Sequence, residues 1–304
     1  MTEYEVRTLD LADAKVATLV RLPADQATKG AILYVHGFAD YFFQRHVAEH
    51  FTARGYDFYA VDLRHYGRSL RDGDTPNFVT DIGEHFEELD AAVDKIHEDG
   101  HTKLVVMAHS TGGLITPLWL DARKDLQVDA LVLNSPWFEL AEPAAARTVG
   151  TALIKAVGKF APKLKLRDGL GSVYGQTIHR DHHGEWDFDL RMKPLAAFPV
   201  LAGWLRAIRI GHAKLQRGLN VTVPVLVLHS NRSLLHAKAW SREAMAADTV
   251  LDVADMVKYA PRLGPDVTVV EIQDGLHDLF LSAEPVRAKA LAEVDTWLEA
   301  HETH

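Results

Sequence analysis

The sequence predicts an α/β fold built on a mostly parallel sheet with helices on both faces. From residue 31 onward, short apolar runs alternate with segments whose apolar residues recur every three or four positions. Such alternation is typical of parallel strands joined by right-handed helical crossovers. The apolar runs are continuous, as expected for strands that are covered on both faces.

Eight segments have the character of strands. Residues 3–9 and 15–22 alternate in polarity around a polar turn and predict an antiparallel hairpin at one edge of the sheet. The last two strands begin near Pro224 and Asp266, and a proline suits only the first position of a strand. The complete set is 3–9, 15–22, 31–35, 56–61, 104–107, 130–133, 224–228 and 266–272.

Helices are predicted between these strands from the spacing of their apolar residues. Glycines at positions 55 and 100 follow two of them and favour helix ends there. The apolar faces comprise Phe43, Val47 and Phe51; Phe86, Leu89, Val93 and Ile96; Leu114, Ile115, Leu118 and Trp119; and Val286, Ala290, Val294, Trp297 and Leu298.

Between residues 138 and 220 the alternation fails. We therefore predict a core made of residues 1–137 and 221–304, with 138–220 inserted as a mostly helical cap. Residues 141–220 carry 13 Lys and Arg but only 6 Asp and Glu, so this segment is basic whereas the whole chain has a net charge of −9. Two cap helices are predicted from the spacing of their apolar residues. These are Val149, Leu153, Val157 and Phe160 in the first, and Phe198, Leu201, Trp204, Leu205 and Ile208 in the second.

Composition excludes several classes of protein. The 304 residues are 47% hydrophobic and 25% charged, as is ordinary for a globular protein, and the net charge of −9 disfavours nucleic-acid binding. The absence of cysteine excludes disulfides, thiolate zinc sites and cysteine nucleophiles. The acidic, polar start has no leader-like pattern and no long apolar stretch follows, so we expect a cytoplasmic enzyme.

Ser110 is the candidate nucleophile. The run Lys103-Leu-Val-Val-Met-Ala-His-Ser-Thr-Gly-Gly113 predicts a buried strand that enters a tight turn and then a helix. Such a turn requires small residues two positions away on either side, and Ala108 and Gly112 meet this requirement. The alternative is a loop that merely links strand to helix.

A serine nucleophile needs a histidine base oriented by a carboxylate. Among 17 histidines, His277 is the best placed, because it lies in the loop after the last predicted strand, at the same sheet edge as Ser110. Asp274 and Asp278 flank His277 too closely to face its ring easily, so we expect structural roles for both.

Taken together, these motifs resemble the α/β-hydrolase fold. The similarity is strongest to its monoacylglycerol lipase, lysophospholipase and serine aminopeptidase branch, and it spans roughly residues 28–300. It rests on the cap and on His36-Gly37-Phe38, Asp62-Leu-Arg-His-Tyr-Gly-Arg-Ser69, Ala108-His-Ser-Thr-Gly-Gly113 and Gly275-Leu-His-Asp278.

The resemblance implies a triad of Ser110, Asp248 and His277. The family elbow is usually Gly-x-Ser-x-Gly, and here Ala108 replaces the first glycine. Asp248 is assigned because the Asp-x-x-x-Asp spacing of 248–252 resembles the family's acid. Asp252 remains the alternative, although its position before an apolar helical pattern favours an N-cap.

The resemblance also places the two backbone donors of the oxyanion hole at Phe38 and Thr111. It implies that His36 braces the first of these loops and that Phe38, His109 and Trp137 line the substrate pocket. No metal or organic cofactor is implied. The cap segment His179-Arg-Asp-His-His-Gly-Glu185 could suggest a metal site, but its spacing fits no strong zinc signature, so we expect a polar loop.

We therefore expect a serine ester hydrolase that acts on monoacylglycerols, lysophospholipids or similar apolar esters. The basic, apolar cap also suits transient contact with an anionic lipid surface, unless Val149, Leu153 and Phe160 simply pack the cap onto the body. The alternatives are a peptidase or other acyl or C–C bond hydrolase, and a binding protein without turnover. The oligomeric state stays open.

Overall fold

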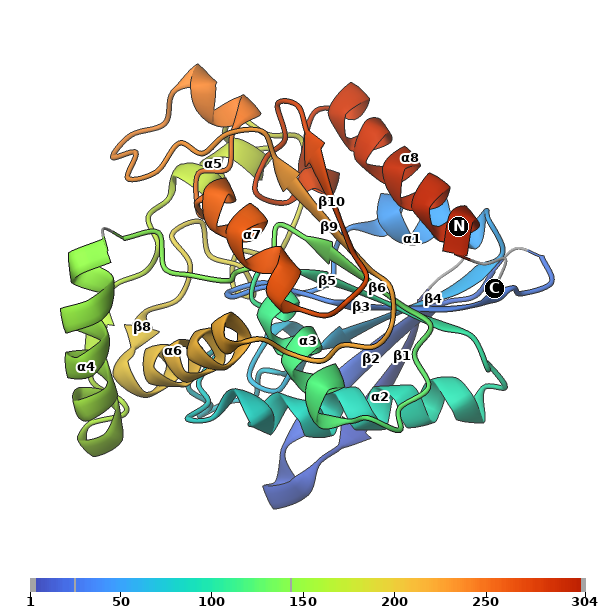
Figure 1. The fold of residues 1–304 in the computed structure, drawn as a ribbon, viewed down its shortest axis with the longest axis horizontal. Helices are drawn as coiled ribbons and strands as arrows, with labels where there is room; N and C mark the ends of the chain where they lie inside the picture. The colour runs from blue at the N-terminus through green and yellow to red at the C-terminus, as the bar shows by residue number, and fades with distance from the viewer. Residues whose placement is uncertain (1–3, 25, 143, 302–304) are drawn as a thin grey trace.

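An eight-stranded sheet forms the centre of the molecule, with its strands in the order β1-β2-β4-β3-β5-β6-β9-β10 (Figure 1). The computed structural model describes residues 4–24, 26–142 and 144–301, with the backbone alone at 144–146, 148 and 149. The strands are β1 (Glu5–Asp10), β2 (Val16–Leu22), β3 (Gly30–Val35), β4 (Tyr56–Asp62), β5 (Leu104–His109), β6 (Ala130–Asn134), β9 (Val225–Ser230) and β10 (Val267–Ile272).

The predicted mostly parallel sheet is confirmed. β1 pairs antiparallel with β2, and β2 with β4, whereas every pairing from β4 across to β10 is parallel. Every residue of β3, β4, β5, β6 and β9 is buried. This burial on both faces explains why these strands appear in the sequence as continuous apolar runs.

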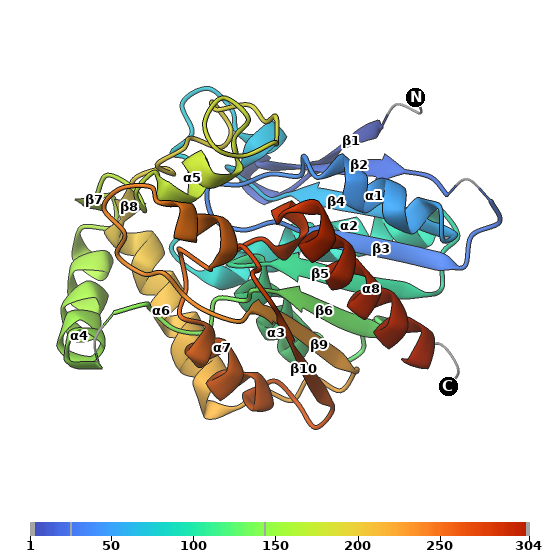
Figure 2. The same ribbon diagram turned by 90° about the horizontal axis from the view of Figure 1, so that it is seen from above.

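Helices cover both faces of the sheet (Figure 2). Phe51 and Trp297 belong to the apolar cluster on one face, and Leu89 and Leu118 belong to the cluster on the other. None of the described helices has the length and apolar character needed to cross a bilayer. The first face carries α1 (Arg45–Thr52) and α8 (Glu284–His301), and the second carries α2 (Phe86–Glu98), α3 (Gly112–Ala122) and α7 (Val253–Tyr259).

The cap, residues 138–220, contains more than the two predicted helices. Helix α6 begins at Ala202, so the assignment of Phe198 and Leu201 to it was wrong: Pro199 disfavours helical backbone at Phe198, and Leu201 pairs with Lys165 in a small sheet. The boundaries at 138 and 220 remain predictions. The elements between β6 and β9 are α4 (Ala144–Phe160), β7 (Lys165–Arg167), α5 (Val173–Ile178), β8 (Val200–Leu201) and α6 (Ala202–Arg217).

Helix α4 lies at the outer edge of the cap (Figures 1 and 2). It contacts α6 at Gly158, where a Cβ atom would lie 2.4 Å from the carbonyl oxygen of Ala202. On α4, Leu153 is 65% exposed and Phe160 is 81% exposed. The alternative that these two side chains pack the cap onto the body was therefore wrong, because a periodic pattern identifies an apolar stripe but does not show what covers it. The side chain of Val149 lies outside the described residues.

The start of α3 lies directly against the end of β3. A Cβ atom on Gly112 would be only 2.6 Å from the carbonyl oxygens of both Val35 and His36. Glycine is therefore required here by the close approach of two backbones.

We expect Gly112→Ala to lower the free energy of unfolding by about 2 kcal/mol or more, because an extra methyl group in a packed region forces backbone shifts. Urea denaturation followed by circular dichroism measures this change. Gly150→Ala is the control, since among the described residues no atom outside the backbone of α4 lies within 4 Å of its Cβ position, and it should be neutral or stabilising by about 1 kcal/mol. Equal stability of Gly112→Ala and the wild type would contradict the packing argument.

Candidate active site

Ser110 lies on the sharp turn between β5 and α3. Its backbone φ of 53° falls in the left-handed region, which costs about 1–3 kcal/mol for a residue other than glycine. The turn is held against β6 because Ser110 N donates to Asn134 O at 3.1 Å and Trp137 N donates to Ser110 O at 3.0 Å. The serine hydroxyl is thus presented at the carboxyl edge of the sheet and the N-terminus of a helix.

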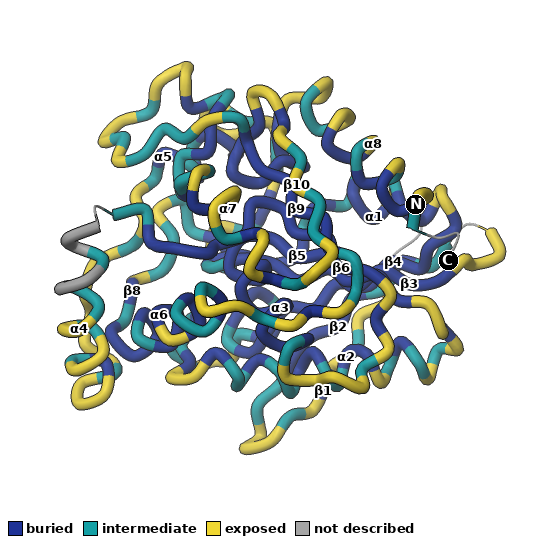
Figure 3. Tube along the Cα trace, in the orientation of Figure 1, coloured by how far each residue is buried: buried dark blue, intermediate teal, exposed yellow. Residues whose placement is uncertain are grey.

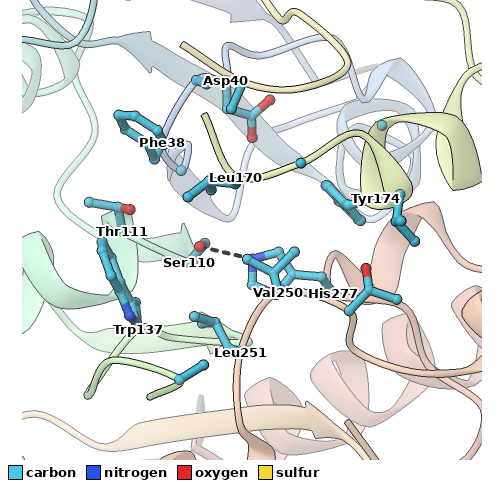
Figure 4. Close-up of a pocket in the computed structure, with 18 of the residues that line it drawn as sticks. Phe38, Asp40, Ser110, Thr111, Trp137, Leu170, Tyr174, Val250, Leu251 and His277 are labelled. Atoms are coloured by element: carbon cyan, nitrogen blue, oxygen red, sulfur yellow. Dashed lines mark hydrogen bonds between the residues drawn. The ribbon is translucent and has the colours of Figure 1, made fainter. Parts of the chain in front are cut away.

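Ser110, His277 and Asp248 form a chain of hydrogen bonds (Figure 4). The distance from His277 Nε2 to Ser110 Oγ is 2.9 Å, and the distance from His277 Nδ1 to Asp248 Oδ2 is 2.8 Å. Because an ionised carboxylate can only accept, Nδ1 carries the ring hydrogen and Nε2 is left to accept from the serine hydroxyl. The structure thus brings together the three residues that the sequence analysis singled out.

Asp248 is held in place by its own loop. Its Oδ1 atom accepts hydrogen bonds from the backbone N–H groups of Val250 and Leu251, both at 2.8 Å. The side chain is completely buried. These bonds satisfy the oxygen that does not face His277, so the carboxylate is fixed at both ends.

The neighbouring aspartates have structural roles. Asp252 caps α7 by accepting from Ala254 N at 3.0 Å, as its place before a helical pattern predicted. Asp278 accepts from Phe280 N at 3.1 Å and from Asn134 Nδ2 at 2.7 Å. It therefore ties the loop that carries His277 to the end of β6.

The loop after β3 lies over the nucleophile. His36 Nε2 accepts from Leu63 N at 3.0 Å, so its Nδ1 donates to Gly37 O at 2.8 Å. Burial lowers the pKa of His36, which favours the neutral ring that this pattern needs. A Cβ atom on Gly37 would approach the Cβ of Ser110 to 3.0 Å. His36 thus braces a loop that must pass close to Ser110.

One side of the pocket is aromatic. The ring of Trp204 lies 4.2 Å from that of Phe38 and 5.8 Å from that of Trp137. Figure 4 shows Phe38, Thr111 and Trp137 on the side of Ser110 away from His277. The residues expected to line the pocket, Phe38, His109 and Trp137, do so, whereas Trp204 was predicted only as a helix position.

The pocket also contains a buried ion pair that the sequence analysis missed. Lys193 Nζ donates to Asp40 Oδ1 at 2.7 Å, and the two residues are 7% and 2% exposed. The ammonium also lies 5.6–5.9 Å from the ring centres of Phe43, Tyr174 and Phe188. Burial raises the pKa of Asp40, but the charge of Lys193 outweighs it and keeps this pKa below its ordinary value. No spacing or motif links two residues 153 positions apart.

His109 is a second imidazole beside the first, with its ring 4.8 Å from that of His277. Burial lowers the pKa of His109 to about 4, so the ring is neutral near pH 7. It therefore adds no positive charge next to the His277 ring.

The histidine-rich segment of the cap forms a tight turn. Backbone N–H groups of His182 and Gly184 donate to His179 O at 3.0 and 3.1 Å, and the His179 ring packs edge-on against Phe188 at 4.7 Å. Within the part of the chain that the structure describes, no three His, Asp or Glu side chains are grouped so that they could hold a metal ion.

Comparison with known proteins matches the family model described as serine aminopeptidase, S33, to residues 26–284. A monoacylglycerol lipase of Mycolicibacterium smegmatis is 27% identical over 283 residues, which cover 91% of this chain and 90% of that relative.

Two solved structures with similar folds are also monoglyceride lipases. One is a soluble variant from Saccharomyces cerevisiae in complex with a substrate analog, with a TM-score of 0.73, 19% identity, and coverage of 99% of this chain and 97% of that one. The other is from Paleococcus ferrophilus, with a TM-score of 0.66, 19% identity, and coverage of 93% and 99%. These likenesses confirm the expected α/β-hydrolase fold.

Stability should fall as the pH drops from about 6.5 towards 4, because buried histidines bind protons only after unfolding. Burial and the charge of Arg209 lower the pKa of His212 to about 3, and burial lowers that of His109 to about 4. In this window the unfolded chain binds more protons, so lowering the pH favours it. Urea denaturation at several pH values measures the free energy of unfolding. Near pH 5, this free energy should change less steeply with pH in His212→Gln than in the wild type, by roughly 1.4 kcal/mol per pH unit. Identical slopes would contradict a neutral His212.

Proposed function

Because the chain belongs to the serine aminopeptidase S33 family of α/β-hydrolases, we propose that it is a serine hydrolase of carboxylic esters with apolar acyl chains. The observation that carries this proposal is the hydrogen-bonded chain from Ser110 through His277 to Asp248, next to an aromatic pocket wall. Monoacylglycerols and lysophospholipids are the proposed substrate classes. The activities named for the lipase relatives support this choice.

In the proposed mechanism, His277 Nε2 removes the hydroxyl proton as Ser110 Oγ attacks the ester carbonyl. Asp248 stabilises the imidazolium that forms. The backbone N–H groups of Phe38 and Thr111 bind the oxyanion, and such a donor contributes about 10²–10³-fold in rate. His277 then protonates the leaving alcohol, and it activates the water that hydrolyses the acyl-enzyme.

The proposed orientation of the substrate follows from the proton transfer. The leaving alcohol must lie within reach of His277, and therefore on the side of Tyr174 and the Asp40–Lys193 pair. The acyl chain then extends to the opposite side, against Phe38 and Trp137. The polar alcohol then lies beside polar and charged side chains, and the apolar acyl chain lies against aromatic rings.

A peptidase is the second candidate, since the family description names one. A peptidase that recognises a free amino terminus needs an available carboxylate near the site. Two carboxylates line this pocket: Asp40 is neutralised by Lys193, and Glu142 belongs to the cap, whose net charge is positive. Both observations favour an ester over a peptide amine.

We expect a fluorophosphonate probe to label the wild type but not Ser110→Ala, since the probe reacts only with an activated serine. In-gel fluorescence measures the labelling, and Ser230→Ala, a buried serine at the end of β9, is the control that should label normally.

Rates on p-nitrophenyl esters should rise with acyl length from acetate, because longer chains cover more of the aromatic wall. Labelling that persists in Ser110→Ala would refute the assignment, and faster turnover of aminoacyl p-nitroanilides than of esters would favour the peptidase. Lack of both labelling and turnover would favour a binding protein.

Asp248→Asn should lower kcat about 10⁴-fold, because an amide cannot hold the required imidazole tautomer or stabilise the imidazolium. Asp252→Asn should stay within a few-fold of the wild type, since asparagine caps a helix about as well as aspartate. Ester hydrolysis by the two variants measures the difference. The opposite ranking would assign the acid to Asp252.

A further inference from the structure

The chain between β9 and Asp248 makes a long excursion, residues 235–247, before it returns to the site. The two ends of the excursion are joined, because Leu234 N donates to Asp248 O at 2.7 Å and Asp248 N donates to Arg232 O at 3.0 Å. These bonds, like the two backbone bonds that hold the Asp248 carboxylate, come from residues outside 235–247. The excursion is therefore an Ω loop that is closed at its base, and Asp248 is held in place without it.

The excursion packs against the cap. It is drawn in orange beside α5 in Figures 1 and 2, and its short 3-10 helix, Arg242–Ala246, contacts α5. The ring of Trp240 stacks on that of His183, with the ring centres 3.5 Å apart and the planes 12° from parallel. The excursion contains both buried and exposed residues (Figure 3). Contacts with the cap therefore hold it on the molecule.

One part of the excursion forms a wall of the active-site pocket. Leu235, His236 and Ala237 all line this pocket. The backbone φ of His236 is 57°, in the left-handed region that is strained for a residue other than glycine. Such a conformation persists only where neighbouring contacts impose it. The packing of the excursion on the cap thus holds this wall in place.

The returning end of the excursion leads to the side of the pocket where the acyl chain is proposed to lie. Val250 and Leu251 follow Asp248 and line the pocket. Leu251 belongs to the same apolar cluster as Trp137, and Figure 4 shows both below Ser110. The excursion therefore borders the space into which the acyl chain extends.

The pocket that these walls enclose is small. Its cavity volume is about 190 Å³, whereas pockets that bury drug-sized ligands hold about 300–1,000 Å³. An ester of a long acyl chain is itself a drug-sized molecule. It does not fit while the excursion stays in place, whereas an ester of a shorter chain does.

We propose that the excursion sets the length of the acyl chain that this enzyme accepts, so that its substrates are esters of short and medium-length acyl chains. This inference rests on the proposed function and narrows its substrate class. A chain longer than the pocket must displace Leu235 and Ala237, and with them the ring of Trp240 from that of His183. Filling a packed site beyond its volume is unfavourable, so longer chains are rejected.

The first test is the chain-length profile of the wild type. We would measure kcat/KM for p-nitrophenyl esters from acetate to laurate, at concentrations where each ester is monomeric. The values should rise to a maximum between butyrate and octanoate and fall about 10-fold or more by laurate. A profile that still rises at laurate would overturn the proposal and leave the ester hydrolase function intact.

A binding measurement separates this inference from the proposed function. Absence of both ester turnover and fluorophosphonate labelling would refute the proposed function. Isothermal titration of Ser110→Ala with octanoate and with laurate then tests the pocket without catalysis. Tighter binding of octanoate would support the limit on chain length, and tighter or equal binding of laurate would overturn it.

Substitutions assign the limit to the excursion. Leu235→Ala shortens a side chain of the wall and Trp240→Ala removes the stack on His183, so each should raise the ratio of kcat/KM for laurate to that for butyrate about 10-fold or more. Ala237→Leu should move the maximum to shorter chains. Lys238→Ala is the matched control, because Lys238 is exposed on the same excursion and does not line the pocket, and its profile should match the wild type. Wild-type profiles in Leu235→Ala, Trp240→Ala and Ala237→Leu would refute the assignment.

Discussion

The close contact between the end of β3 and the turn that carries Ser110 is the constraint on which the rest of the site depends. Gly112 lets the start of α3 approach the carbonyls at the end of β3, and Gly37 lets the following loop lie close to Ser110, since a Cβ atom on Gly37 would be only 3.0 Å from the Ser110 Cβ. With side chains at these positions the loop would be pushed away. The proposed oxyanion donors, Phe38 N–H and Thr111 N–H, could then no longer point at one carbonyl oxygen, and electrostatic stabilisation of this kind depends on preorganised geometry.

The three residues of the site are far apart in the sequence, and local hydrogen bonds hold the backbone or the side chain of each one in place. Each of the three residues is fixed locally before it meets the others: Ser110 by bonds to β6 and from Trp137, and Asp248 by two backbone donors of its own loop. The His277 loop is tied to β6 through Asp278 and Asn134. Little backbone freedom is therefore left to be lost when the three side chains align, so their hydrogen bonds form on an already ordered site.

Local patterns predicted the sheet, the serine turn and the capping role of Asp252, because each depends on residues that are neighbours in sequence. Tertiary contacts decided the rest. The predicted start of α6 was wrong because Leu201 pairs with Lys165 of β7 in a small sheet. Periodicity found the apolar stripe of α4, but the exposure of Leu153 and Phe160 depends on what packs nearby. The Asp40–Lys193 pair joins two segments that no pattern connects, and the choice of Asp248 needed a family resemblance.

The cap and the loop over the nucleophile are coupled at two points. Lys193 donates a hydrogen bond to Asp40, and the Trp204 ring packs at a tilt against Phe38, two residues earlier in the same loop. Separating the ion pair would leave a buried charge uncompensated, a change that costs about 3–5 kcal/mol. The cap therefore cannot move away without disturbing the loop that is proposed to supply Phe38 N–H.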